Sequence, residues 1–198
     1  MPSIRAFIAV EIDPQTKQKI SALVSSLKKS DADVKWITED QMHLTLKFLG
    51  NVEQSKIQEI SAALNSISTN FSPFTIHLSN IGAFPNINHP RVIWLGIDIG
   101  AEELKILAEK IETGLEKLGF NPSTSLGTGK EDREFKAHLT LGRVKSSKNI
   151  ANLIKLLKET VFSLNADIPI EEIILFQSTL FPKGAIYTKL WTAYLPLS

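Results

Sequence analysis

One phrase occurs twice in the sequence and constrains the fold more than any other feature. Residues 43–50 read HLTLKFLG and residues 138–144 read HLTLGRV, so His-Leu-Thr-Leu begins at His43 and again at His138. The two histidines lie 95 residues apart (138 − 43) in a chain of 198 residues, close to half of its length. At average residue usage, Leu-Thr-Leu should follow a given histidine on the order of once in a thousand cases, and the chain has only four histidines. The duplication therefore indicates an internal repeat with two structurally similar lobes.

The alternation of side chains along a β-strand predicts what each copy of the phrase does. In the first copy, His43 and Thr45 share one face of the strand, and the leucines at 44 and 46 share the other. The second copy repeats this arrangement with His138 and Thr140. We expect the leucines to anchor each strand in a core, which leaves both histidine faces free to meet across a central cleft.

The rest of the sequence is typical of an α+β protein with antiparallel or mixed sheet. Apolar runs and β-branched residues predict strands at 4–12, 34–37, 42–49, 74–84, 91–99, 135–144, 170–178 and 185–195. Apolar residues at helical spacing predict helices at about 14–29, 53–67, 104–118 and 149–160, and Asp13-Pro14 predicts the start of the first one. The length suits one domain over residues 1–198, or two small lobes that share a core. The segment 121–132, NPSTSLGTGKED, has the composition of a surface loop insertion.

Composition excludes several classes of function. The formal net charge is +1, so no overall positive field attracts nucleic acid and any RNA contact must be local. The chain has no cysteine, which excludes disulfides, thiolate nucleophiles and cysteine-bound metals and fits a reducing cytoplasm. No apolar stretch approaches the roughly 18 residues that span a membrane. We therefore expect a cytoplasmic protein, a monomer, with no membrane partner.

Two opposed histidines suit one kind of chemistry. Because the unperturbed pKa of histidine is near 6.5, one imidazole can accept a proton while the other donates one. In-line displacement at phosphorus needs such a pair on opposite sides, and threonine hydroxyls can hold the non-bridging oxygens. Two histidines without further ligands make a poor metal site, so neither metal nor cofactor is expected. A single His-x-Thr on a strand is more often a structural contact, but its repetition reverses that preference.

At these residues the chain resembles the two-histidine (2H) phosphoesterase superfamily, which is defined by two His-x-Thr-x motifs. Within it, the chain is most similar to the RNA 2′,3′-cyclic phosphodiesterases, once named 2′-5′ RNA ligases. The likeness extends through IRAFIAVEIDP, VKWITEDQMHLTLKFLGNV, IGAFPNINHPRVIWLGI, FKAHLTLGRVK and ILFQSTLFPKGAIYTKL. The segment 121–132 and Glu134-Phe135 depart from the pattern of the family.

The resemblance implies a bilobal fold with a pseudo-twofold axis, and hydrolysis of RNA 2′,3′-cyclic phosphate ends to 2′-phosphates. It implies that His43 donates a proton to the leaving 3′ oxygen and that His138 activates water, although a symmetric pair exchanges these roles on reversal. Thr45, Thr140 and Arg143 would bind the phosphate, with a strand-end surface arginine as the alternative for Arg143. Other substrates at the same site stay open, among them 2′-5′-linked oligonucleotides, small cyclic nucleotides and reverse 2′-5′ ligation. A non-catalytic module that binds RNA ends is the more distant alternative.

Weaker candidates follow from alternation alone. Lys47 should share the face of His43, where it would contact RNA or stay solvated, and Phe48 should pack with the leucines. Arg133 would lie at the edge of the groove. His77 and His89 are expected to be structural or superficial, and the three tryptophans at 36, 94 and 191 are expected in the core.

Overall fold

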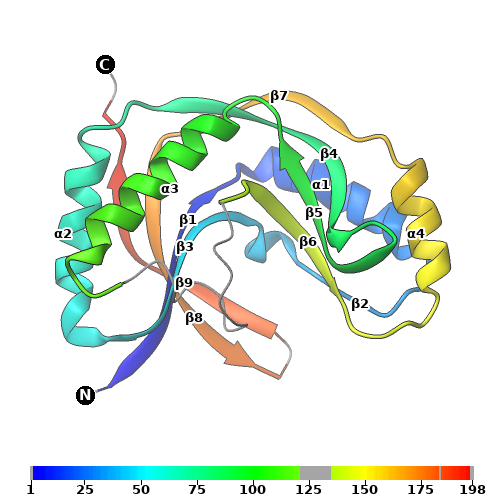
Figure 1. The fold of residues 1–198 in the computed structure, drawn as a ribbon, viewed down its shortest axis with the longest axis horizontal. Coiled ribbons are helices and arrows are strands. Elements are labelled where there is room, and N and C mark those ends of the chain that lie inside the picture. The colour runs from blue at the N-terminus through cyan, green and yellow to red at the C-terminus, as the bar shows by residue number, and fades with distance from the viewer. Residues whose placement is uncertain (1, 121–134, 183, 197–198) are drawn as a thin grey trace.

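The histidine phrases lie in two antiparallel sheets that stand face to face across the middle of the molecule (Figure 1). The structure, a computed structural model, describes residues 2–120, 135–182 and 184–196. The predicted loop at 121–132 and Arg133 lie outside these described residues. Within them, no helix has the length and apolar character needed to cross a membrane.

The first sheet, sheet A, combines strands from both ends of the chain. Its strands run in the order β3-β1-β8-β9 and every neighbouring pair is antiparallel. The strands are β1 (Ser3–Glu11), β3 (His43–Glu53), β8 (Glu172–Phe181) and β9 (Gly184–Tyr194). His43 is therefore the first residue of an edge strand.

The second sheet, sheet B, has the order β2-β6-β5-β4-β7 and is also antiparallel throughout. Its strands are β2 (Val34–Trp36), β4 (Phe74–Asn86), β5 (His89–Ile97), β6 (His138–Val144) and β7 (Ser163–Ile170). Both motif strands begin at their histidine, and each pairs with one long strand of its own sheet. The short β2 comes from the first half of the chain yet joins the second sheet, so the two lobes are interleaved.

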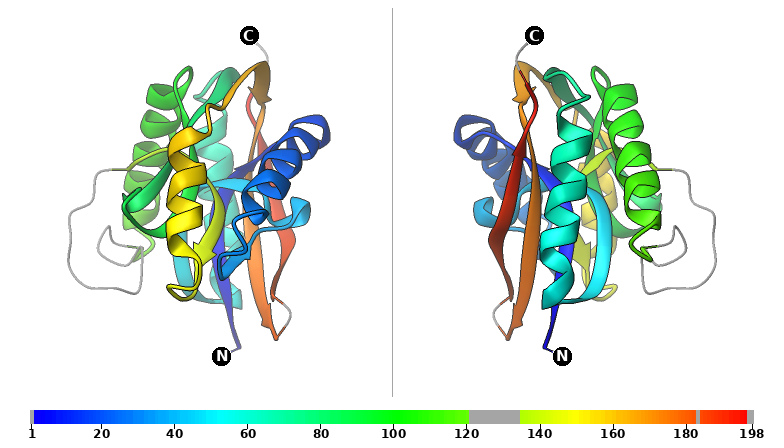
Figure 2. Two further views of the ribbon diagram at one scale, coloured as in Figure 1. Left: turned by 90° about the vertical axis from the view of Figure 1, so that its right-hand side faces the viewer. Right: turned by 90° about the vertical axis from the view of Figure 1, so that its left-hand side faces the viewer.

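Helices cover the outer faces of both sheets, as Figure 2 shows from the two sides. They are α1 (Pro14–Lys28), α2 (Ile57–Ser68), α3 (Ala101–Glu116) and α4 (Ile150–Glu159). Helices α2 and α3 pack against each other and against sheet A, whereas α1 packs against α4 at the other end of the molecule. Helix α1 begins as the sequence predicts, because the Asp13 carboxylate accepts a hydrogen bond from the Thr16 N–H at 2.9 Å and Pro14 fills the first turn.

The fold class predicted from the sequence, α+β with antiparallel sheets and external helices, is confirmed. Strand β7 was missed, because Asp167 and Pro169 interrupt its apolar pattern. Pro169 is tolerated there because β7 is an edge strand that pairs only with β4.

Candidate active site

The leucines of the duplicated phrase anchor both motif strands, as predicted. In β3, Leu44 and Leu46 are 2% and 6% exposed, and in β6 Leu139 and Leu141 are fully buried. All four belong to one continuous apolar core that includes residues of both sheets. The opposite faces carry His43 and Thr45 in sheet A and His138 and Thr140 in sheet B.

A β-bulge follows the threonine in both copies of the phrase. In sheet A, Thr45 pairs with Ala9 but Lys47 pairs with the next residue of β1, Ile8, so Leu46 is an extra residue. In sheet B, Thr140 pairs with Trp94 and Gly142 with Ile93, so Leu141 is extra in the same way. A bulge of this kind shifts the alternation of side chains by one position.

The bulges decide which later residues share a face with the histidines. Phe48 pairs with Phe7 and Arg143 pairs with Val92, so each residue five positions after a motif histidine returns to the histidine face. Arg143 thereby lies with His138 and Thr140, where the predicted phosphate-binding role would need it. Plain alternation would have placed Arg143 on the opposite face.

The same shift overturns both predictions made for the residues after the first motif. Lys47 neither contacts the histidine face nor stays solvated: its side chain is 1% exposed and its Nζ lies 2.5 Å from a carboxylate oxygen of Glu112 in α3. Phe48 does not pack with the leucines but lies 6.1 Å from Phe7, ring centroid to ring centroid. It belongs to a small apolar cluster on the histidine face of sheet A, formed with Ala9, Ile174, Phe176 and Tyr187.

Aromatic rings surround His43. The centroid of its imidazole lies 4.8 Å from that of Phe7, 6.2 Å from that of Phe176 and 5.1 Å from that of Tyr187, which meets it edge to face. This burial lowers the pKa of His43 from 6.5 to about 4, and the charge of Lys17 acts in the same direction. A hydrogen bond to the main chain of Gln41 and the charge of Glu11 act against the shift.

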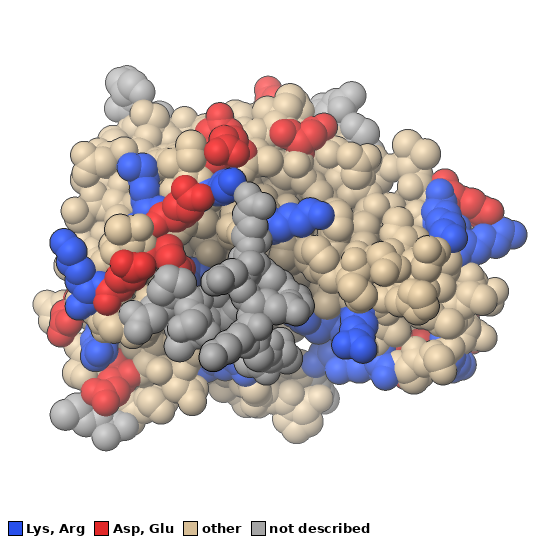
Figure 3. Space-filling view, in the orientation of Figure 1, with Lys and Arg blue, Asp and Glu red and all other residues tan. Residues whose placement is uncertain are grey.

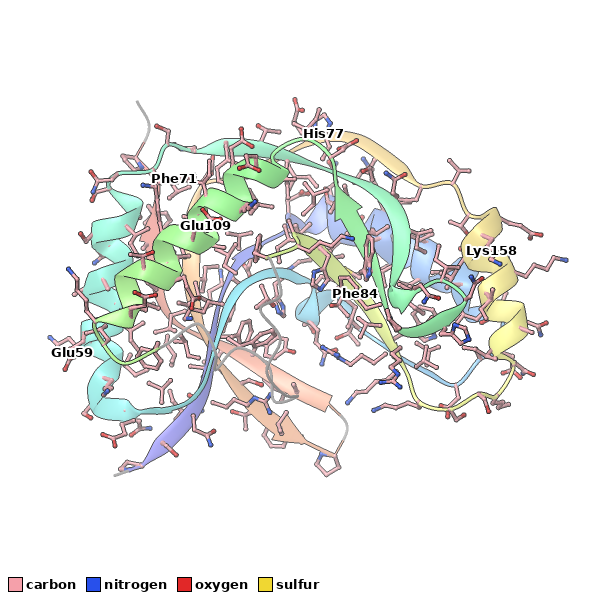
Figure 4. The ribbon with its side chains drawn as sticks, in the orientation of Figure 1. Glu59, Phe71, His77, Phe84, Glu109 and Lys158 are labelled. Carbon is pink, nitrogen blue, oxygen red and sulfur yellow. The ribbon has the colours of Figure 1, made fainter. Side chains whose placement is uncertain are left out.

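His138 lies in a second aromatic setting on sheet B. Phe84, from β4, meets it edge to face at 5.0 Å, and Trp94 lies 6.4 Å away. In Figure 4, Phe84 lies toward the middle of the molecule, while His77 lies at the other end of the same strand and Lys158 extends outward from α4. Burial lowers the pKa of His138, and the charges of Arg143 and Lys136 act in the same direction.

Both histidines are held through the main chain two residues earlier. Nδ1 of His138 lies 2.7 Å from the carbonyl oxygen of Lys136, and His43 makes the corresponding main-chain hydrogen bond with Gln41. Because a carbonyl oxygen only accepts, Nδ1 of His138 carries the hydrogen and Nε2 is the nitrogen left for proton transfer.

The two motif strands approach each other between the sheets. Strands β3 and β6 belong to different sheets, yet some of their Cα atoms come within 8 Å of each other. The charge of Arg143, from sheet B, acts on the hydroxyl of Tyr187 in sheet A, and the charge of Arg5 acts on the same group. Tyr187 in turn lies against His43.

Sequence reasoning missed Tyr187, Phe84 and Arg5 as neighbours of the site. No local motif marks them, since their place follows from strand order. Trp94 was expected in the core but lies beside His138 on the histidine face, flat across Gly82, where an added Cβ would come within 2.3 Å of its ring. Trp191 is 41% exposed and so lies outside the core as well.

The remaining histidines stay apart from the site. His77 pairs with Asp167 at 2.7 Å, and His89 is exposed at the start of β5. Among the described residues, no three His, Asp or Glu side chains are grouped so that they could hold a metal ion.

Charge is unevenly distributed around the site. In Figure 3, acidic side chains follow α3 on the left of the molecule, while Lys and Arg side chains gather below the centre. Helix α3 carries glutamates at positions 102, 103, 109, 112 and 116. A polyanion would therefore be repelled from the α3 side and accepted more readily on the opposite side.

Comparisons with known proteins agree with this geometry. The family model described as "LigT like Phosphoesterase" matches residues 10–94 and 98–187. Curated relatives from several organisms carry the name RNA 2′,3′-cyclic phosphodiesterase. The one from Archaeoglobus fulgidus is 35% identical over 188 residues, with 94% of this chain and 98% of the relative covered. The one from Methanothermobacter thermautotrophicus is 33% identical over 185 residues, with 93% and 95% covered.

Solved structures share the fold. A crystal structure of a Thermus thermophilus protein superposes with a TM-score of 0.80 at 27% identity, covering 98% of this chain and all of the other. The structure of E. coli LigT complexed with 3′-AMP superposes with a TM-score of 0.74 at 22% identity, covering 98% and 99%. With the family model matching nearly the whole chain and relatives above 30% identity along its length, this protein belongs to the LigT-like group of the two-histidine phosphoesterases.

Proposed function

We propose that the protein hydrolyses RNA ends that carry a 2′,3′-cyclic phosphate and leaves the phosphate on the 2′ oxygen. The observation that carries the proposal is the repeated local structure: two His-x-Thr strands, each followed by a bulge in the same register, on sheets that approach each other. The names of the relatives from Archaeoglobus fulgidus and Methanothermobacter thermautotrophicus support the same substrate.

In the proposed reaction, water attacks phosphorus in line with the bond to the 3′ oxygen. His138 takes a proton from the water through Nε2, and His43 gives a proton to the 3′ oxygen as the P–O3′ bond breaks. The next turnover requires His43 to be reprotonated and His138 to lose its proton to solvent. The negative phosphate favours the charged form of an adjacent imidazole, which offsets the effect of burial on His43.

Hydrogen-bond donors around the phosphorus would stabilise the transition state. Thr45 and Thr140 would donate their hydroxyl hydrogens to the two non-bridging oxygens, and the Arg143 guanidinium would balance their charge. No step needs a metal ion, so activity should be unchanged by a chelator.

The experiment uses an RNA oligonucleotide that ends in a 2′,3′-cyclic phosphate. Changing either His43 or His138 to alanine should lower the rate by at least about 1000-fold, because each removes one half of a coupled proton transfer. The thermal melting temperature of each variant is the control for folding. Full activity in either variant would overturn the two-histidine mechanism.

Identification of the product by mass and by nuclease sensitivity separates the alternatives. A 2′-phosphate is the expected product. Binding of the cyclic end without turnover would instead identify a module that recognises RNA ends. Supply of a 5′-hydroxyl RNA tests 2′-5′ joining, in which the 5′ hydroxyl replaces water and the same 3′ oxygen leaves, so the two histidines keep their roles.

A further inference from the structure

The two histidines occupy equivalent positions but face different partners across their strands. Glu11 of β1 is directly opposite His43, whereas Gly96 of β5 is directly opposite His138. Residues directly opposite each other in an antiparallel pair point to the same face, with Cβ atoms about 4.5–5.5 Å apart. The position opposite His43 therefore carries a carboxylate, whereas the position opposite His138 carries no side chain.

The charges that act on the two histidines also differ. The Lys17 ammonium on α1 favours the neutral form of His43, and the charge of Glu11 opposes it with a smaller effect. On the other side, both charges that act on His138, those of Arg143 and Lys136, are positive and favour its neutral form. Burial is the largest effect on both histidines, but a negative charge, that of Glu11, acts on His43, whereas the charges that act on His138 are both positive.

Glu11 is itself held by an ion pair. Lys189, on β9 two strands away from β1, places its Nζ 2.6 Å from a carboxylate oxygen of Glu11 and 3.6 Å from one of Glu172 in the intervening β8. Tyr187, another titratable group, also lies against His43, and its ring meets the imidazole edge to face. The ammonium of Lys189 thus fixes the carboxylate of Glu11 and partly neutralises the charge that His43 experiences.

We propose that Glu11 is a positioning residue that supports His43 as the proton donor of the catalytic pair against the opposing charge of Lys17, and that Lys189 adjusts the strength of this support. This inference rests on the proposed function for its catalytic meaning, but its electrostatic part holds in the protein without substrate. Glu11 acts through His43 and does not touch the phosphate.

The first experiment follows the titration of each histidine by NMR in the substrate-free protein. Lys189→Met keeps the aliphatic stem but frees the charge of Glu11, so the midpoint of His43 should rise by about half a pH unit or more, while that of His138 stays unchanged. Lys189→Arg should restore the original midpoint. Lys155→Met, which removes an exposed lysine of the Lys155–Glu159 pair on α4, is the control for a change in net charge.

The second experiment measures the pH dependence of hydrolysis. A proton donor limits the rate on the alkaline side, since it must be protonated to act. Lys189→Met should therefore shift the alkaline limb to higher pH, and Glu11→Gln should shift it to lower pH, with the acidic limb fixed. A shift of the acidic limb instead would show that His43 is the base and would overturn the assignment.

The two experiments separate the inference from the function on which it rests. An unchanged His43 midpoint in Lys189→Met would refute the role of Glu11 whether or not the protein is active. A shifted midpoint in a protein that fails to hydrolyse cyclic ends would refute the proposed function and leave the electrostatic coupling intact. Because Lys189→Met and Glu11→Gln have opposite predicted signs, general destabilisation cannot imitate both.

Discussion

Arg143 illustrates how much one side chain depends on the local path of its strand. It is exposed on the histidine face because the bulge at Leu141 shifts the alternation. Loss of a charge-assisted hydrogen bond to phosphate costs about 2 kcal/mol, or about 30-fold in kcat/KM. We predict this loss for Arg143→Met, and a smaller one for Arg143→Lys, in an assay of cyclic-phosphate hydrolysis.

A suitable control for Arg143 is Arg91, an exposed arginine on β5. Arg91 precedes Val92 in β5, and Val92 pairs with Arg143. Because neighbouring side chains of a strand point to opposite faces, the side chain of Arg91 points away from the histidine face. Arg91→Met should keep kcat/KM within about twofold of the wild type. Equal losses in the two variants would mean that only overall charge attracts the RNA.

The lowered pKa of His43 also predicts how the free energy of unfolding depends on pH. This pKa is lowered to about 4 in the folded protein, against about 6.5 in the unfolded chain. Between these values the unfolded chain binds more protons, so the free energy of unfolding must decrease as the pH falls from about 6.5 to about 4. The loss is on the order of 2–3 kcal/mol.

Urea unfolding at pH 7 and at pH 4.5 measures this effect. His43→Gln, which cannot titrate, should lose less stability over that interval than the wild type by about 2 kcal/mol. An identical loss in both proteins would show that His43 is not the group responsible.

At the scale of the elements, the Lys47–Glu112 pair connects β3 to α3 behind the first motif. The side chain of Lys47 is 1% exposed, so Lys47→Met leaves Glu112 without its partner, and Glu112→Gln leaves the buried ammonium without a countercharge. We predict that each single change lowers the free energy of unfolding by about 3 kcal/mol, and that the double change Lys47→Met/Glu112→Gln costs less than their sum.

Chemical denaturation of the four proteins completes a double-mutant cycle for this pair. The exposed pair Lys155–Glu159, with atoms 4.0 Å apart, provides the contrast. Breaking it should change stability by less than about 0.5 kcal/mol. Additive losses at Lys47 and Glu112 would show that the two residues do not interact in the folded protein.

The sequence predicted the elements well and the details of strand pairing poorly. The helices begin and end within a few residues of their predicted limits, because apolar spacing and the Asp13-Pro14 start are local signals. The bulges leave no such signal: HLTLKF and HLTLGR read as regular alternation, and only the partners of Leu46 and Leu141 across the sheet show the shift. Regular alternation therefore predicts the correct strand face for His43 and Thr45 but the wrong face for Lys47 and for Phe48.

At the scale of the whole molecule, the strand orders mix the two halves of the chain. Sheet A takes β8 and β9 from the C-terminal end, and sheet B takes β2 from the N-terminal part. The repeat of the phrase predicted two similar lobes, but nothing local reveals which sheet a late strand will join. The residues that complete the surroundings of His43, such as Tyr187, were unpredictable for that reason.

This interleaving predicts one cooperative unfolding transition. Neither half of the chain can complete a sheet alone, and one core includes residues of both sheets. Trp36 lies on β2 of sheet B and Trp191 on β9 of sheet A, so variants that keep one or the other tryptophan report on each sheet by fluorescence. Their urea midpoints should coincide, whereas two separated midpoints would identify independently folding lobes.

The unlike residues at matched positions of the two strands have one more consequence. A catalyst whose two sides were identical would treat the 2′ and 3′ oxygens of a ribose alike and would release either one. The contrasts between Phe48 and Arg143, and between Glu11 and Gly96, are places where the two sides differ. Regioselectivity in a protein built on a duplicated phrase therefore has to originate at such mismatched pairs, because the phrase itself is the same on both sides.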